Sequence, residues 1–167
     1  DFCPQNRADS PEKNWNAWEK KMTRPMDWVS GAHFIVAVGQ HDIVIRGGGT
    51  ISGNRDAFGP IAVRDPWKRL AVPMPWRPGE MIWICESDRI TIENVTFLDA
   101  PFWTCLLQGC NDIKVTNLRV DMDPWTRNGD GFTLDGCRNV VMSNCMIRSA
   151  DDCIVIKADH RRLKRKQ

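Results

Sequence analysis

The chain has 167 residues, a size that suits one domain. Hydrophobic residues make up 42% of it and charged residues 26%, and it holds no run of 18 apolar residues, which excludes a helical membrane span. The formal net charge is +2, but five positive and no negative charges fall in residues 161–167. The body is therefore mildly acidic. This argues against a nucleic-acid-binding face, and we interpret the basic tail as solvated.

Cysteine and tryptophan are used unevenly. The seven cysteines are an odd number, so at least one thiol is free or pairs outside the chain. There are eight tryptophans and no tyrosine. Tryptophan rings stack on sugars but also fill protein cores, so composition leaves both uses open.

A short pattern recurs along the chain: two apolar residues flank one outward residue, and an asparagine follows two positions later. The copies are Ile90/Ile92 with Asn94, Ile113/Val115 with Asn117, and Val140/Met142 with Asn144. The intervals between these asparagines are 23 and 27 residues. An earlier copy begins at Asp42, which lies 46 residues before Asp88, and we interpret this interval as two periods of 23.

A further short strand is predicted before each copy, at 81–84, 103–107, 131–134 and 153–156. Three short alternating strands in every 22 to 27 residues, with no helical stretch between them, predict a parallel β-helix. The asparagines predict a ladder in which each side-chain amide bonds to the next coil. Asn94 begins a glycosylation sequon, but we expect it to be buried in this ladder. A leucine-rich repeat would need a leucine consensus and an antiparallel sandwich would need hairpin turns, which the sequence lacks.

The coils do not fill the chain. Residues 1–40 predict an N-terminal cap, with a helix near 11–22 and a first strand. Residues 41–157 hold about four coils, and a proline-rich stretch at about 54–80 predicts an insertion within them. Residues 158–167 form the basic tail.

Aspartates gather in two neighbouring coils. Aligning Leu134 with Ile156 puts Asp130 opposite Asp152, 22 residues later in the chain. In-register neighbours in a parallel sheet lie about 4.8 Å apart. Asp151 is adjacent and lies above Gly129. Three carboxylates are therefore predicted to converge where a turn meets the sheet.

Like charges this close raise the pKa of at least one carboxyl group. A protonated carboxyl beside ionised ones is the acid/base division used in glycoside hydrolysis. Turn aspartates also satisfy backbone amides, but three at stacked register outweigh that reading. A calcium site, as in polysaccharide lyases of similar architecture, remains a second functional interpretation.

These residues resemble glycoside hydrolase family 28, the polygalacturonase family, from Asp42 to about Lys157. Residues 47–53 are similar to the family's Gly-x-Gly-x-Ile-x-Gly segment. Residues 128–131 match Asn-Thr-Asp-Gly, with Gly129 in place of the threonine. Residues 150–153 match Gly-Asp-Asp-Cys, with Ala150 in place of the first glycine.

The resemblance implies a right-handed parallel β-helix that hydrolyses galacturonan-type pectin with inversion and without a cofactor. It implies that Asp151 is the general acid and that Asp130 and Asp152 together activate the water. Asn128 would position the neighbouring carboxylate or the sugar. The partner would be an acidic plant cell-wall polysaccharide, met by a secreted or periplasmic monomer that binds neither nucleic acid nor a membrane.

Three further residues are expected to bind substrate. Trp125, just before the Asn-Gly-Asp-Gly motif, and Trp103, at the register of Asp130, are candidate sugar platforms, and Lys157 lies beside the aspartates. Cys110 and Cys137 fall at one register, and both a disulfide and stacked thiols fit that position.

The family's later Gly-His-Gly and Arg-x-Lys segments are not present in the 167 residues. The next coil would place its inward pair near Arg162 and Lys164, which are charged. We therefore expect an incomplete and inactive N-terminal and central piece of such an enzyme. The alternatives are a non-catalytic or calcium-binding β-helix that binds acidic polysaccharide, and a polysaccharide lyase.

Overall fold

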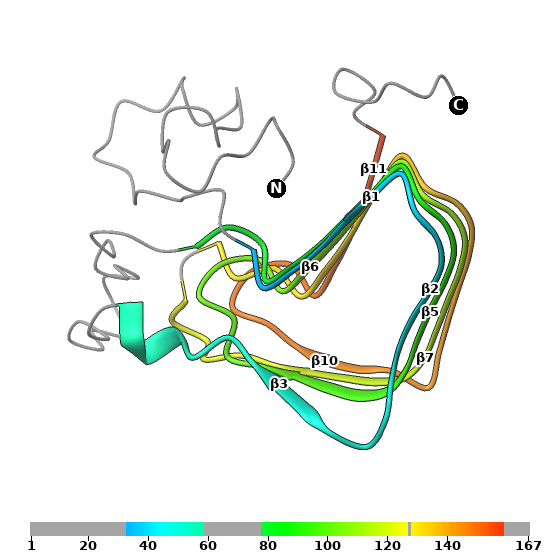
Figure 1. The fold of residues 1–167 in the computed structure, drawn as a ribbon. Helices are drawn as coiled ribbons and strands as arrows, with labels where there is room; N and C mark the ends of the chain where they lie inside the picture. Colours follow the sequence, from blue (N-terminus) through cyan, green and yellow to red (C-terminus); the bar gives the residue numbers. More distant parts are fainter. Residues whose placement is uncertain (1–32, 59–77, 127, 159–167) are drawn as a thin grey trace, which may run out of the picture.

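The computed structural model describes residues 33–58, 78–126 and 128–158 (Figure 1). All strand pairings recorded in these residues are parallel. Figure 1 looks along the stack and shows strands of successive coils lying over one another around a common outline. The predicted right-handed parallel β-helix is confirmed. The expected helix near 11–22, most of the insertion and the end of the tail lie outside the described residues.

One sheet collects the first strand of every coil. Its order is β1 (Ile35–Val38), β4 (Ile82–Cys85), β6 (Cys105–Gln108), β8 (Phe132–Asp135) and β11 (Ile154–Lys157). These strands begin one or two residues later than the sequence predicts. Leu134 pairs with Ile156, so the predicted register between the last two coils is correct.

The second sheet turns a corner of the coil. It contains β2 (His41–Arg46), β3 (Thr50–Ser52), β5 (Asp88–Leu98), β7 (Asn111–Asp121), β9 (Arg138–Ser143) and β10 (Met146–Arg148), and the 3-10 helix η2 (Arg55–Phe58) follows β3. β2 pairs directly with β5. The interpretation of the first interval as two periods is therefore wrong: it is a single coil that carries the insertion.

The core lies between the two sheets. The predicted inward residues are buried or pack against the core: Ile90, Ile92, Ile113, Val115, Val140 and Met142. Strict alternation produces this arrangement, because every second side chain of a strand points to the same face. A smaller apolar cluster, with Trp83 and Leu106 at its centre, forms on the outer face of the first sheet.

An asparagine ladder stabilises one corner. Asn117 Nδ2 donates to Asn94 Oδ1 at 2.8 Å, and Asn144 Nδ2 donates to Asn117 Oδ1 at 3.3 Å. All three residues have a positive φ of 52° to 53°, a conformation that asparagine tolerates better than most residues. The predicted ladder is confirmed, but the expected burial of Asn94 is wrong. The ladder runs along the outside of the corner, so its side chains are exposed.

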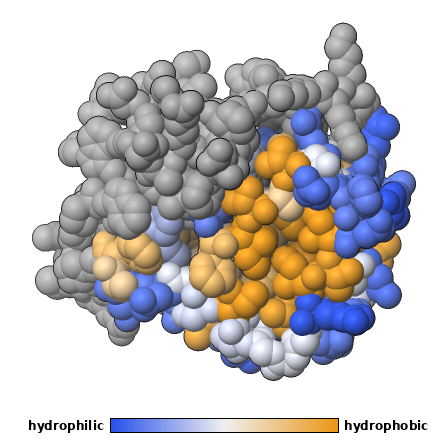
Figure 2. Space-filling view, viewed as in Figure 1, coloured by the Kyte–Doolittle hydropathy of each residue, from blue (hydrophilic) through white to orange (hydrophobic). Residues whose placement is uncertain are grey.

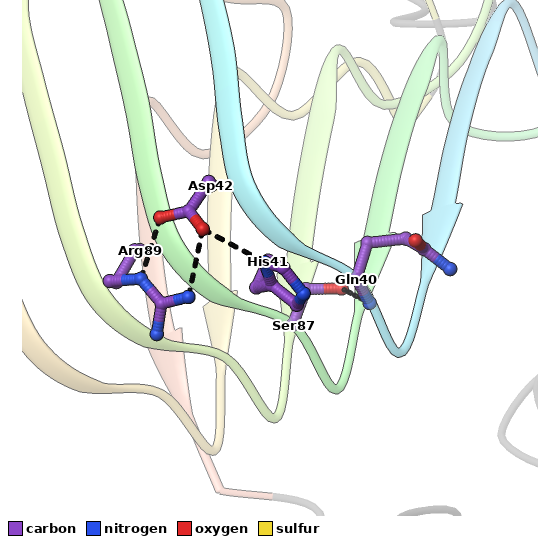
Figure 3. Close-up of polar contacts among 5 residues, drawn as sticks. All are labelled: Gln40, His41, Asp42, Ser87 and Arg89. Carbon is purple, nitrogen blue, oxygen red and sulfur yellow. Dashed lines mark hydrogen bonds and ion pairs between the residues drawn. The ribbon is translucent and has the colours of Figure 1, made fainter.

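Charged and polar side chains stabilise the corner between the first and the second sheet (Figure 3). The Asp42 carboxylate accepts hydrogen bonds from Arg89 Nε at 2.6 Å and Nη2 at 2.9 Å, and also contacts the His41 ring. These bonds hold the pKa of Asp42 well below its usual range. The backbone N–H of Gln40 donates to Ser87 Oγ at 3.1 Å. Together these contacts fasten β2 to β5.

The coil stack exposes apolar side chains at its ends. Figure 2, in the same view as Figure 1, shows hydrophobic residues gathered over the coil outline. The large exposed ones are Phe34, Val44, Val141, Met146, Ile154 and Ile156. No helix within the described ranges has the length and hydropathy of a membrane span.

Candidate active site

One row of residues crosses the beginning of the first sheet. Glu80, Trp103, Asp130 and Asp152 each lie two residues before a strand of that sheet. The Thr104 N–H donates to the Asp130 carbonyl at 2.8 Å, and the Gly131 N–H donates to the Asp152 carbonyl at 2.9 Å. The backbone hydrogen bonds between neighbouring strands of the first sheet thus continue into the turns that precede these strands. It sets Asp130 between Trp103 and Asp152.

Two glycines allow the turns to approach this closely. A Cβ on Gly131 would lie 2.6 Å from the Cys153 carbonyl oxygen. A Cβ on Gly129 would lie 2.8 Å from Ala150 Cβ. The Gly129 carbonyl accepts the amides of Ala150 at 3.0 Å and Asp151 at 3.1 Å, which places Asp151 over the Gly129 turn. The two departures from the family motifs, Gly129 and Ala150, are therefore direct neighbours.

The three aspartates differ in their contact with water. Asp130 is 8% exposed, whereas Asp151 and Asp152 are exposed. Burial, and then the charges of Asp151 and Asp152, raise the pKa of Asp130 to about 7. Lys157 opposes this rise, and Glu80 adds to it. The sequence predicts that crowding raises the pKa of one carboxyl; at Asp130 burial is the larger cause and the neighbouring charges are the second.

Trp103 and Lys157 form the cationic and aromatic side of the site. Lys157 Nζ lies 4.4 Å from the centroid of the Trp103 ring, a cation–π distance. The Trp103 ring stacks on Phe102, with centroids 5.4 Å apart and an interplanar angle of 6°. Trp103 Nε1 and Thr133 Oγ1 are buried without a hydrogen-bond partner. Buried polar groups are usually paired, so these two atoms are exceptions in this structure.

The other two predicted binding residues lie in the turn before β8. Asn128 is half-buried and has a positive φ of 48°. Trp125 is also half-buried, and its amide donates to Asp123 Oδ1 at 2.8 Å. Among the described residues, no hydrogen bond or ring contact joins the Trp125 indole to the aspartates. The structure therefore brings Trp103 and Lys157 to the cluster more closely than Trp125.

Sequence reasoning missed Glu80 and His33. Glu80 occupies the same position before β4 as Trp103 before β6, and this spacing could have found it. His33 Nδ1 lies 2.8 Å from the Glu80 carbonyl oxygen and 3.4 Å from Glu80 Oε2. No such positional signal marks His33, because its contact with Glu80 arises only when β1 pairs with β4.

The described residues hold no group of three His, Cys, Asp or Glu side chains arranged to bind a metal ion. Cys110 and Cys137 are free thiols in the structure. Cys110 Sγ donates to the Ile84 carbonyl at 3.4 Å, and Cys137 Sγ donates to the Leu107 carbonyl at 3.2 Å. Interaction between the neighbouring thiols lowers the pKa of Cys137 and, together with burial, raises the pKa of Cys110. Of the two arrangements open from the sequence, the structure has the stacked thiols.

Known proteins resemble this chain in fold and in sequence. A solved structure named "putative glycosyl hydrolase", from Parabacteroides merdae, superposes with a TM-score of 0.54 at 20% identity. The match covers 80% of this chain and 65% of that one, and it supports the fold alone.

Curated polygalacturonases match over most of this chain. Polygalacturonase QRT2 of Arabidopsis thaliana is 27% identical over 141 residues, which are 84% of this chain and 30% of that protein. Polygalacturonase-2 of Solanum lycopersicum is 24% identical over 116 residues, 69% of this chain and 24% of that protein. The chain thus spans less than a third of these relatives. The sequence model described as glycosyl hydrolases family 28 matches residues 17–166, so the chain belongs to that family.

Proposed function

We propose that this chain carries the aspartate cluster of a polygalacturonase-type hydrolase, which cleaves galacturonan or rhamnogalacturonan bonds of pectin with inversion. One observation carries the proposal: Asp130, with a pKa of about 7, lies in register with Asp152 and beside Asp151. Inverting hydrolysis needs one protonated and one ionised carboxyl on opposite sides of the scissile bond. A cluster that holds a proton on one group and leaves two exposed groups beside it meets that need.

In the proposed mechanism, Asp151 protonates the leaving oxygen while Asp130 and Asp152 activate the water. In the free site the shared proton resides on Asp130, because that carboxyl is buried. Substrate bound over the exposed Asp151 excludes water from it and raises its proton affinity. The proton then passes to Asp151, and Asp130 becomes an ionised base. The pKa of about 7 describes the buried carboxyl of Asp130 in the free site.

The remaining residues suit an acidic polysaccharide. Lys157 offers a positive charge to a uronate carboxylate. The Trp103 ring already packs against Phe102 and beneath Lys157, so a sugar would meet the edge of this ring. Asn128 positions a carboxylate or a sugar hydroxyl, and Trp125 extends the aromatic surface along the turn. A cell-wall polysaccharide lies outside the cytoplasm, which supports a secreted or periplasmic location. We also propose that the complete protein is a monomer.

We further propose that residues 1–167 alone do not turn the polymer over, because they lack the Gly-His-Gly and Arg-x-Lys segments. Two other functions would use the same residues. A binding β-helix would hold acidic polysaccharide without any cleavage. A lyase would use calcium, but the three aspartates are not arranged as a group that could hold a metal ion.

The test is to express the complete coding sequence that contains these residues and assay it on polygalacturonan. We expect release of reducing ends, inversion of the anomeric configuration by NMR, and loss of both in Asp151→Asn. Galacturonosyl fluoride, whose leaving group needs no proton, should remain a substrate for Asp151→Asn but not for Asp152→Asn. Unsaturated products that require calcium would replace the proposal with a lyase. Tight binding without any product would replace it with a binding module.

A further inference from the structure

Arg55 is a buried cation far from the aspartates in sequence. It begins η2, which Gly53 and Asn54 separate from β3, and its side chain is 4% exposed. The backbone beneath it is fixed to the next coil: the Gly53 N–H donates to the Leu98 carbonyl at 2.8 Å, and the Arg55 N–H donates to the Asp99 carbonyl at 3.2 Å. Gly53 is packed so closely that a Cβ there would lie 2.7 Å from Ala100 Cα. The guanidinium therefore extends from a rigid base.

The guanidinium has one buried partner and one exposed partner. Arg55 Nε donates to Thr126 Oγ1 at 3.1 Å, and Thr126 is 2% exposed. Arg55 Nη1 pairs with Asp56 Oδ1 at 2.9 Å, but the Asp56 side chain is 81% exposed. Buried charges are retained where they make hydrogen bonds that water cannot replace. The bond to Thr126 meets that condition, whereas the bond to Asp56 is open to solvent.

Thr126 leads directly into the turn that carries Asp130. A Cβ on Gly129 would lie 2.9 Å from the Thr126 carbonyl oxygen, so the two ends of the turn touch. The Gly129 carbonyl in turn accepts the amides of Ala150 and Asp151. A continuous set of contacts thus joins Arg55, Thr126, Gly129 and Asp151.

We infer that Arg55 is a positioning residue, which through Thr126 fixes the turn at Gly129 and so sets Asp151 against Asp130. It touches no aspartate of the cluster, and it acts through the backbone. That the cluster is catalytic rests on the proposed function. The positioning of Asp151 by Arg55 does not rest on it, and testing this positioning needs no measurement of turnover.

The test compares Arg55→Met and Thr126→Val with Asp56→Asn in residues 1–167. NMR hydrogen exchange reports the protection of the Ala150 and Asp151 amides, and carbon-detected titration reports the pKa of Asp130. We expect both variants to reduce protection at Ala150 and Asp151 about tenfold relative to the Ile113 amide, because one bond to a charged donor is lost. The loosened turn admits water, so the pKa of Asp130 should fall by roughly one unit.

The controls separate positioning from general stability. Asp56→Asn removes the exposed partner of the same guanidinium and should leave both readouts unchanged. Thr126→Ser keeps the acceptor and should behave as wild type, and Arg55→Met with Thr126→Val should add nothing to either single change. If Arg55→Met does not fold, the nearly isosteric Thr126→Val carries the test. A uniform loss of protection that includes Ile113, an unchanged pKa of Asp130, or an equal effect of Asp56→Asn would overturn the inference.

Discussion

Asp130 and Asp152 occupy the same register on neighbouring strands, yet one is buried and the other is exposed. Asp130 has Trp103 in register on one side and Asp152 on the other. Asp152 precedes β11, which is the edge strand of its sheet in the part of the chain that is described. Two aspartates one coil apart therefore have different environments, and burial raises the pKa of the inner one, Asp130, to about 7.

Stability should fall as pH rises through the pKa of Asp130. Its carboxyl titrates near 3.8 when unfolded and about 7 when folded. The stabilising proton is fully bound below the lower value, and its contribution disappears as pH passes the higher value. Asp130→Asn should therefore raise the free energy of unfolding at pH 8 by on the order of 2 kcal/mol, and change it little at pH 4. Urea unfolding at both pH values measures this, and an equal effect at both would contradict it.

Activity of the complete protein should depend on the same proton. The proposed mechanism needs one proton in the cluster, and the free site loses it above about pH 7. kcat/KM on polygalacturonan should therefore fall about tenfold per pH unit above that value. The uronate groups of the substrate are ionised throughout this range, so they do not mask the effect. A profile that rises through pH 7 would show that the active cluster carries no proton.

Gly129→Ala should destabilise the fold, because the added Cβ meets Ala150 Cβ at 2.8 Å. We expect a loss of about 1–3 kcal/mol in urea unfolding. Gly129→Ala combined with Ala150→Gly should recover part of it, since the closest contact is removed. Gly48→Ala is the matched control, because a Cβ at Gly48 would meet nothing within 4 Å. If the double variant is no better than Gly129→Ala alone, the two positions are not coupled.

The asparagine ladder should depend on both the side chain and the backbone conformation of Asn117. Asn117→Ala removes two hydrogen bonds and leaves a non-glycine residue at a φ of 53°. We expect a loss of about 2 kcal/mol. Asn117→Gly loses the same bonds but relieves the backbone strain, so its thermal unfolding should fall between wild type and alanine. Identical melting temperatures for the two variants would rule out a backbone contribution.

Cys110 and Cys137 should form a disulfide under a mild oxidant such as diamide. They share one register, and a strand separation of about 4.8 Å lies within the range that a disulfide spans. Interaction with the neighbouring Cys110 thiol lowers the pKa of Cys137, so we expect Cys137 to react first. Peptide mapping should find the Cys110–Cys137 link and leave the fully buried Cys105 unmodified. Modification of Cys137 without the link would contradict the predicted geometry.

The sequence predicts the coils well, because their signal is local and repeated. The alternation of Ile90 and Ile92, and the asparagines that follow, determine which side chains face inward and where the corner falls. The register of Leu134 with Ile156 follows from the same repeat. These features need no knowledge of contacts between distant residues.

Other features depend on contacts that no local pattern reveals. The exposure of Asn94 follows from which side of the corner the ladder occupies. The raised pKa of Asp130 follows mainly from the burial of its carboxyl, which the sequence pattern does not report. Arg55 meets Thr126 across 71 positions of sequence, so only the fold brings them together.

The coils differ in length, but nearly all of the difference falls in one place. Ladder partners at the corners are 23, 27 or 47 residues apart, while the connection from the first strand to the second always has two residues. The spare length falls mainly in the turn before each strand of the first sheet, which is where Glu80, Trp103, Asp130 and Asp152 lie. Changes in the sequence and length of these turns therefore leave both the asparagine corner and the Asp42–Arg89 corner in place. The scaffold thus separates the corners, whose spacing is fixed by the ladders, from the turns, whose length varies.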